Sequence, residues 1–173
     1  MKTCISKSRE ETIQIGRELG ETLKGGEVIA FRGDLGMGKT CFTSGLALGL
    51  GYDGAVTSPT FALINEYLGG RVNLYHFDMY RISSWEELYS CGFFEYIDQG
   101  GVVAAEWSEN IEMALPENTI YAGFEYLDEN SRLRFSKHKF TAFDFSYSEA
   151  EYLYFNLTCS ELSSIFLTSF LYT

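Results

Sequence analysis

The sequence predicts an α/β fold in which a mixed central sheet with hairpins is flanked by helices. Two short apolar runs, residues 27–32 and 102–105, have the length and composition of buried strands. A helix is expected after the first run, because Phe42, Leu46 and Leu50 recur at helical spacing. Alternation of buried strands with amphipathic helices is typical of α/β domains.

Capping residues predict two further helices. Ser8 and Glu11 have the spacing of a capping box, which satisfies free backbone N–H groups in the first turn of a helix. The apolar stripe of this helix consists of Ile15, Leu19 and Leu23, and the helix is expected to end at Gly25-Gly26. Ser83 or Ser84 is expected to begin a short helix that carries Trp85, Leu88 and Tyr89.

Two turn signals predict hairpins. Residues 62–68 and 71–78 flank Gly69-Gly70, and residues 119–127 and 132–140 flank a polar Asp-Glu-Asn-Ser segment. A hairpin pairs antiparallel strands, so the sheet is expected to be mixed.

Residues 33–40 carry a motif with a specific chemical use. Their sequence, Gly-Asp-Leu-Gly-Met-Gly-Lys-Thr, matches G-x-x-x-x-G-K-[ST] in full. In such a loop, backbone N–H groups surround phosphate oxygens, Lys39 reaches the β- and γ-phosphates, and the Thr40 hydroxyl ligates Mg²⁺. The motif predicts a domain of the P-loop NTPase type that binds ATP or ADP with Mg²⁺. The predicted nucleotide-binding residues of this segment are Gly33, Asp34, Leu35, Gly36, Met37, Gly38, Lys39, Thr40 and Cys41.

Two carboxylates are placed for metal binding and hydrolysis. Asp78 and Glu106 each end an apolar segment, and ligands of open α/β sheets gather at the carboxyl ends of strands. A carboxylate there holds Mg²⁺, directly or through water, or orients the attacking water; the alternative for each is an exposed acid after a strand. We predict Thr40, Asp78 and Glu106 as metal ligands, with direct contact by either acid left open, and Glu106 and Lys39 as catalytic residues. Trp107 either packs near the nucleotide, as a further binding residue, or fills the core.

Charge, cysteine content and the N-terminal residues indicate which partners and which cellular location to expect. The 173 residues carry a formal net charge of −11, so we expect no broad electropositive face for nucleic acid and no DNA partner. The four cysteines are far apart and form no C-x-x-C pair, which favours free thiols in a reducing cytoplasm. The N-terminal residues have no apolar core of signal-peptide length, which also favours a cytoplasmic location.

The chain is expected to divide near residue 140. Residues 1–140 are predicted to form the ATPase domain, and residues 141–173 a C-terminal extension whose role is not indicated. The apolar residues at helical spacing in this extension are Phe155, Cys159, Leu162, Phe166 and Phe170. We expect a helix that docks on the domain or on a partner and does not span a membrane, because Glu161 interrupts the apolar stretch.

Four sequence blocks together resemble the TsaE (YjeE) family, small bacterial ATPases needed to make the threonylcarbamoyladenosine modification of tRNA. The blocks are residues 33–40, Thr57-Ser-Pro-Thr-Phe61, Tyr75-His-Phe-Asp-Met-Tyr-Arg81 and Glu106-Trp-Ser-Glu109, in the order of the family. Many NTPases share the first block, whereas the other three are far more specific. The sequence departs from the family at Cys41, where a hydroxyl residue is expected, and at Ser108, where proline is frequent.

The resemblance implies a role for each block. It assigns residues 33–40 to ATP and Mg²⁺, Asp78 to the metal and Glu106 to hydrolysis. Ser58, Pro59 and Thr60 would belong to a switch-like loop that senses the γ-phosphate. The implied partners are the TsaD and TsaB proteins, and tRNA would be reached indirectly through their complex.

Two other functions stay open at the level of sequence. A small-molecule or nucleotide kinase would need an acceptor site and usually a mobile lid that contains arginine. A nucleotide-gated adaptor would bind ATP without hydrolysing it and would not need both Asp78 and Glu106.

Overall fold

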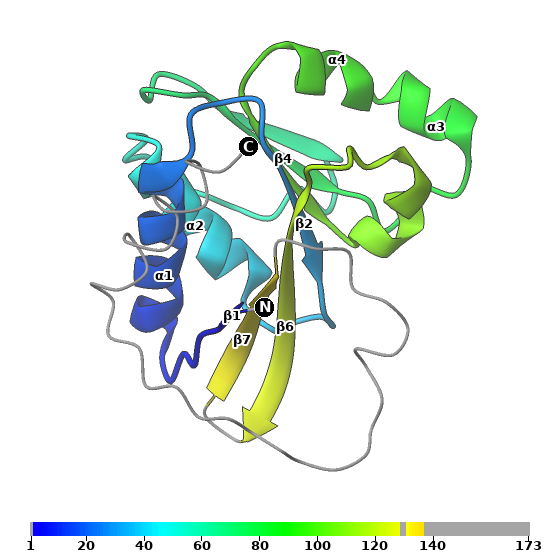
Figure 1. Cartoon of the computed structure of the whole chain (residues 1–173). Helices are drawn as coiled ribbons and strands as arrows, with labels where there is room; N and C mark the ends of the chain where they lie inside the picture. Colours follow the sequence, from blue (N-terminus) through cyan, green and yellow to red (C-terminus); the bar gives the residue numbers. More distant parts are fainter. Residues whose placement is uncertain (1, 129–130, 137–173) are drawn as a thin grey trace.

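The computed structural model describes residues 2–128 and 131–136, which build a seven-stranded sheet with helices on both faces (Figure 1). The strands are β1 (Lys2–Thr3), β2 (Val28–Arg32), β3 (Ile64–Tyr67), β4 (Leu74–Asp78), β5 (Val102–Glu106), β6 (Ile120–Asp128) and β7 (Ser131–Ser136). The helices are α1 (Arg9–Thr22), α2 (Lys39–Gly49), α3 (Trp85–Ser90), α4 (Phe93–Asp98) and the 3₁₀ helix η1 (Ser108–Ala114). The predicted α/β class is confirmed.

The centre of the sheet is parallel and its edges are antiparallel. The strand order is β1-β7-β6-β2-β5-β4-β3. β2 runs parallel to β5 and β6, and β4 runs parallel to β5. The predicted hairpins are confirmed as the antiparallel pairs β3–β4 and β6–β7. The carboxyl ends of β2, β4 and β5 therefore lie at one edge of the sheet, where the predicted site residues occur.

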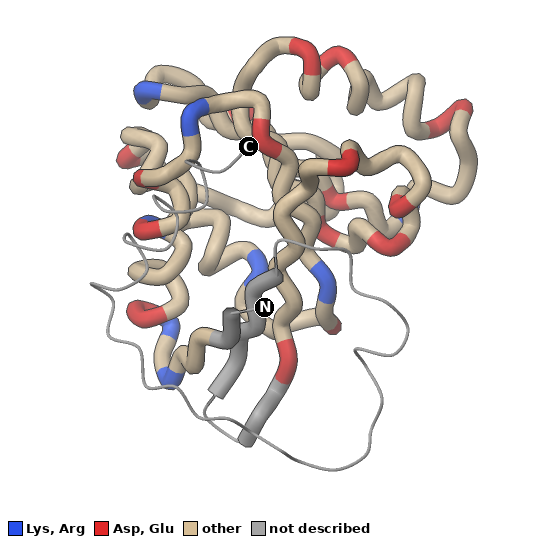
Figure 2. Tube along the Cα trace, in the orientation of Figure 1, with Lys and Arg blue, Asp and Glu red and all other residues tan. Residues whose placement is uncertain are grey.

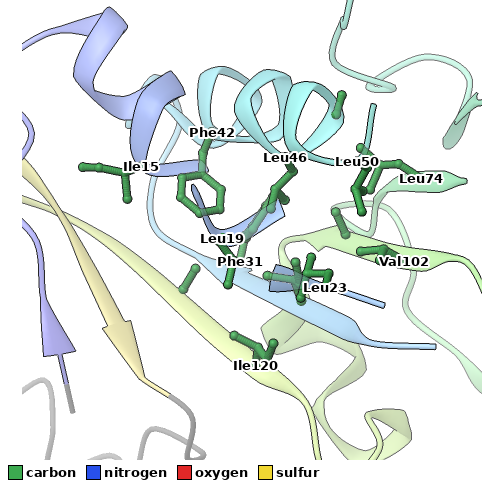
Figure 3. Close-up of a cluster of buried hydrophobic side chains, with 14 of the residues drawn as sticks. Ile15, Leu19, Leu23, Phe31, Phe42, Leu46, Leu50, Leu74, Val102 and Ile120 are labelled. Atoms are coloured by element: carbon green, nitrogen blue, oxygen red, sulfur yellow. The ribbon is translucent and has the colours of Figure 1, made fainter. Parts of the chain in front are cut away.

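Side chains of β2 alternate between two cores. Ile29 and Phe31 belong to the core under α1 and α2, whereas Val28 and Ala30 belong to the core with residues of α3, α4 and η1. Figure 3 shows the first core, in which Phe42 of α2 lies close to Phe31. The two rings meet edge to face with centroids 5.6 Å apart. This contact fixes α2 against the strand that leads into the phosphate-binding loop.

Four helical glycines bring α1 and α2 into close contact. Gly16 and Gly20 of α1 lie against Gly45 and Gly49 of α2. A Cβ atom on Gly45 would lie 2.0 Å from the carbonyl oxygen of Ile13 and 2.9 Å from the Cα atom of Gly16. The two backbones thus touch with no side chain between them, and α1 braces the helix that begins at the phosphate-binding loop.

The predicted helix starts are confirmed by their caps. The Ser8 hydroxyl accepts a hydrogen bond from the backbone N–H of Glu11 at 3.1 Å. Of the two candidate serines before α3, Ser84 is the cap, and its hydroxyl accepts from the backbone N–H of Glu87 at 3.2 Å.

The end of α1 differs from the prediction. The helix ends at Thr22, before Gly25-Gly26. The guanidinium group of Arg71 donates to the carbonyl oxygens of Gly20 and Leu23, at 2.5 and 2.6 Å, at the end of the helix. The Gly20 carbonyl oxygen also accepts the backbone N–H of Leu23 at 3.3 Å. The Gly25-Gly26 pair instead forms the turn into β2, where both residues have a positive φ.

The predicted helix of the C-terminal extension, residues 141–173, lies outside the described residues. Among the residues that are described, no helix has the length and apolar character that a membrane crossing requires.

Candidate functional site

The glycine-rich segment, residues 33–38, connects the end of β2 to the start of α2. Gly33 has a φ of +135°, and a Cβ atom on it would lie 2.5 Å from the carbonyl oxygen of Phe124. Gly38 has a φ of +97° and forms the N-cap of α2. Other residues are strained in this conformation, so the glycines allow the loop to turn its backbone toward a ligand at the positive end of the helix.

The Lys39 side chain folds back over this loop. It is 4% exposed, and its ammonium group donates to the carbonyl oxygens of Gly33 at 2.6 Å and Asp34 at 2.9 Å. Burial lowers the pKa of Lys39, and nearby carboxylates, of which Glu106 acts most strongly, oppose this effect. The predicted loop lysine is therefore held in the loop, among acidic groups.

Trp107 lies directly against this lysine. Its ring centroid is 4.6 Å from Lys39 Nζ, a cation–π distance, and 5.0 Å from the ring centroid of Tyr80. Trp107 has a φ of +56°, which is uncommon for a bulky residue. Trp107 is partly buried, and it contacts both the loop lysine and the core that includes residues of α3, α4 and η1.

The two predicted carboxylates stand side by side on adjacent strands. Asp78 and Glu106 are register partners at the ends of β4 and β5, and both are buried. The Thr40 hydroxyl donates to Glu106 Oε1 at 3.2 Å. Asp78 Oδ1 accepts from the backbone N–H of Tyr80 at 3.0 Å. The start of α2 and the ends of β4 and β5 thus converge, as the sequence predicts.

The donor set fits a cation that is shared with a phosphate. Within the described residues, no three His, Cys, Asp or Glu side chains gather into a metal site of their own. Mg²⁺ is usually held by one or two carboxylates together with waters and phosphate oxygens of the substrate. Thr40, Asp78 and Glu106 supply a hydroxyl and two carboxylates beside the phosphate-binding loop, so these residues would hold Mg²⁺ together with a bound nucleotide.

The predicted switch loop lies between α2 and β3. Ser58 and Thr60 are exposed, and their hydroxyl groups are 2.8 Å apart. The root of the loop is fixed to β3, because the Tyr67 hydroxyl and the Asn65 amide donate to the carbonyl oxygen of Thr57, at 2.9 and 3.1 Å. The buried Pro59 accepts the backbone N–H groups of residues 62 and 63, which closes a turn.

A cleft connects this loop to the carboxylate end of β4. Its lining residues are Thr60, Phe61, Leu63, Asp78, Tyr80 and Arg81. Thr60 of the predicted switch loop and Asp78 of the predicted metal site therefore share one cleft, with the exposed Arg81 beside them.

Two contacts in the site are not predicted by the sequence. His76 Nε2 lies 2.9 Å from Glu106 Oε1. The Ser108 hydroxyl, at the position where the resembling family often has proline, is buried and donates to the carbonyl oxygen of Phe31 at 2.9 Å. That bond joins the segment after Glu106 to the end of β2. Both contacts link residues that are far apart in the chain. A local sequence pattern therefore does not predict them.

A glycine-rich loop between a parallel strand and a helix, with a lysine, a threonine and two strand-end carboxylates around it, defines a nucleotide-binding domain of the P-loop class. Comparison with known proteins agrees. The model of the family described as "Threonylcarbamoyl adenosine biosynthesis protein TsaE" matches residues 6–134. The chain belongs to the TsaE family.

Curated relatives support this assignment over most of the chain. The tRNA threonylcarbamoyladenosine biosynthesis protein TsaE of Treponema pallidum is 41% identical over 129 residues, which are 75% of this chain and 95% of the relative. The protein of the same name from Nostoc sp. is 41% identical over 168 residues, 94% of this chain and 91% of the relative. The crystal structure of Bacillus subtilis YdiB matches with a TM-score of 0.63 and 33% identity, over 78% of this chain and 83% of that chain.

Proposed function

We propose that this chain is a Mg²⁺-dependent ATPase that supports threonylcarbamoyladenosine modification of tRNA in the cytoplasm. The observation that carries the proposal is the convergence of Lys39, Thr40, Asp78 and Glu106 on one loop. Membership of the TsaE family supports the proposed pathway. Relatives named for tRNA threonylcarbamoyladenosine biosynthesis match this chain over most of its length.

The proposed roles follow from chemistry and position. Backbone N–H groups of residues 33–38 surround the phosphates, and Lys39 turns its ammonium from its own loop to the β- and γ-phosphates. Thr40 and Asp78 would hold Mg²⁺, which would supply positive charge to neutralise the phosphates. Glu106 orients the attacking water, and Trp107 shields the loop from solvent on one side.

The proposed partners are the TsaB and TsaD proteins, with tRNA reached through their complex. Figure 2 shows Asp and Glu distributed over the described elements, with Lys and Arg scattered between them. The net charge of −11 disfavours direct binding of a polyanion over a wide face. The cleft between Thr60 and Arg81 is the place where a partner could detect the nucleotide, because it joins the predicted switch loop to Asp78.

The proposal is tested by measuring ATP hydrolysis and association with TsaB and TsaD, each with and without ATP. We expect slow hydrolysis by the chain alone, faster hydrolysis with the pair, and retention of the pair in a pull-down only with ATP. ATP consumption that depends instead on a small-molecule acceptor would favour a kinase. Rapid hydrolysis by the chain alone, unchanged by the pair, would contradict the partner assignment.

Lys39→Ala is expected to weaken ATP binding about 10- to 100-fold, because charge-assisted hydrogen bonds to phosphate contribute about 1.5–3 kcal/mol. Isothermal calorimetry with ATP and Mg²⁺ measures the effect. Lys24→Ala is the matched control, since it removes the same charge from an exposed position before β2. Equal ATP affinity in the Lys39 variant and in this control would show that the loop does not bind phosphate as proposed.

A further inference from the structure

His76 occupies an unusual position for an ionisable side chain. It lies in the middle of β4, two residues before Asp78, and is 0% exposed. Its Nε2 atom is 2.9 Å from Oε1 of Glu106 on the adjacent strand β5. A carboxylate only accepts hydrogen bonds, so Nε2 carries the proton and donates it to Glu106.

The contact with Glu106 explains why an imidazole is buried here. Burial of a polar group is unfavourable unless its atoms are hydrogen-bonded. Among the described residues, Nδ1 of His76 has no hydrogen-bond partner, so the Glu106 carboxylate supplies the polar contact of the ring. The ring of Tyr67 lies beside it, with centroids 6.4 Å apart, and restricts its orientation. The site thus holds the imidazole in one place with its donor directed at Glu106.

Glu106 Oε1 accepts hydrogen bonds from two different donors. One is the Thr40 hydroxyl at 3.2 Å and the other is His76. In a P-loop the hydroxyl oxygen of this threonine also ligates Mg²⁺ through a lone pair, so the metal as well as Glu106 sets its position. His76 is fully buried, and Glu106 is its polar contact among the described residues. Because both donors use Oε1, the other carboxylate oxygen is left for a water molecule or a metal ion.

We propose that His76 is a positioning residue that holds the Glu106 carboxylate in the orientation needed for hydrolysis. The inference rests on the proposed function, because it takes Glu106 as the group that orients water. His76 itself does not contact the nucleotide. Its effect is therefore expected on the rate constant at saturating ATP and not on ATP affinity.

A matched pair of amide variants tests the position of the donor. In His76→Gln the amide nitrogen reaches the place of Nε2, whereas in His76→Asn it stops near the place of Nδ1. We expect kcat to fall about 10- to 100-fold in His76→Asn and in His76→Leu, which is the range for a misplaced catalytic group. His76→Gln should recover most of the rate, and the Kd for ATP should stay within about twofold of the wild type in all three variants.

Tyr75→Phe is the control for a purely structural effect. Tyr75 is the neighbouring residue on β4, belongs to the opposite core, and donates a hydrogen bond to Gln99 at 3.0 Å. Loss of this hydrogen bond should lower the melting temperature and leave kcat unchanged.

Folded His76→Asn and His76→Leu variants that hydrolyse ATP as fast as the wild type would overturn the inference. A His76→Gln variant that is no faster than His76→Asn would also overturn it. If His76→Leu does not fold, the amide pair carries the kinetic test.

A crystal structure of His76→Gln and of His76→Asn separates this inference from the proposed function. Glu106 should stay beside Thr40 in the Gln variant and leave that place in the Asn variant. An unmoved carboxylate in His76→Asn would refute the positioning role. A wild-type protein that hydrolyses no ATP, alone or with partners, would instead contradict the proposed function, and the structures would still decide the role of His76.

Discussion

Glu106→Gln is expected to lower kcat for ATP hydrolysis about 100-fold or more, the range for loss of a group that directs proton transfer. The Gln amide oxygen can accept the hydrogen bonds that Thr40 and His76 give to Oε1, at 3.2 and 2.9 Å, so the fold around it is preserved. The substitution therefore removes the negative charge and little else. Because this charge is needed near the transition state, the Kd for ATP should change less than about threefold.

Single-turnover hydrolysis and calorimetry measure the two quantities separately. Glu117→Gln makes the same charge change at an exposed residue between η1 and β6 and should behave as the wild type. Normal hydrolysis by Glu106→Gln would mean that the other strand-end carboxylate, Asp78, orients the water. Equal loss of binding and of hydrolysis would instead assign Glu106 to the metal.

Gly45→Ala is expected to lower the free energy of unfolding by about 3 kcal/mol, which is the upper part of the range for overpacking. The added Cβ would lie 2.0 Å from the carbonyl oxygen of Ile13 and 2.8 Å from the backbone nitrogen of Arg17. These are backbone atoms of a helix, which cannot move singly, so α1 and α2 must separate. The higher helix propensity of alanine offsets only about 1 kcal/mol of this cost.

Urea denaturation measures the loss, with Leu48→Ala as the control. Leu48 lies on the same helix but is 41% exposed, so its truncation should cost less than about 1 kcal/mol. Because α2 begins at the phosphate-binding loop, ATP should also stabilise Gly45→Ala less than it stabilises the wild type. A variant that unfolds at the same urea concentration as the wild type would show that the helices adapt without cost.

The sequence predicts those parts of the molecule that depend on neighbouring residues. The loop glycines, the helical spacing of Phe42 and Leu46, and the Gly69-Gly70 turn each act over a few positions, and the structure agrees with all three. The family assignment also followed from short blocks, because each block holds several functional residues in a fixed local order.

Contacts between distant segments could not be predicted in this way. That Asp78 lies opposite Glu106 depends on the register of β4 and β5, and the His76–Glu106 bond depends on the same register. The hydrogen bonds at the end of α1 come from Arg71, 48 residues after the carbonyl group of Leu23 that it binds. The glycines of α1 and α2 have no apolar side chain, so they do not contribute to a hydrophobic pattern. Their role in the close packing of the two helices is visible only in the structure.

β3 is an edge strand of the sheet, so a loop that is bound to it lies apart from the strands that carry the groups proposed for chemistry. The groups proposed for chemistry belong to β4, β5 and the loop after β2, which neighbouring elements enclose on both sides. The predicted switch loop is tied to the outermost strand, through Tyr67 and Asn65. Substitutions there alter what the surface offers to a partner and leave the interior register of the sheet intact. A conformational change of this loop can therefore take place without displacing the strands that carry the groups proposed for hydrolysis.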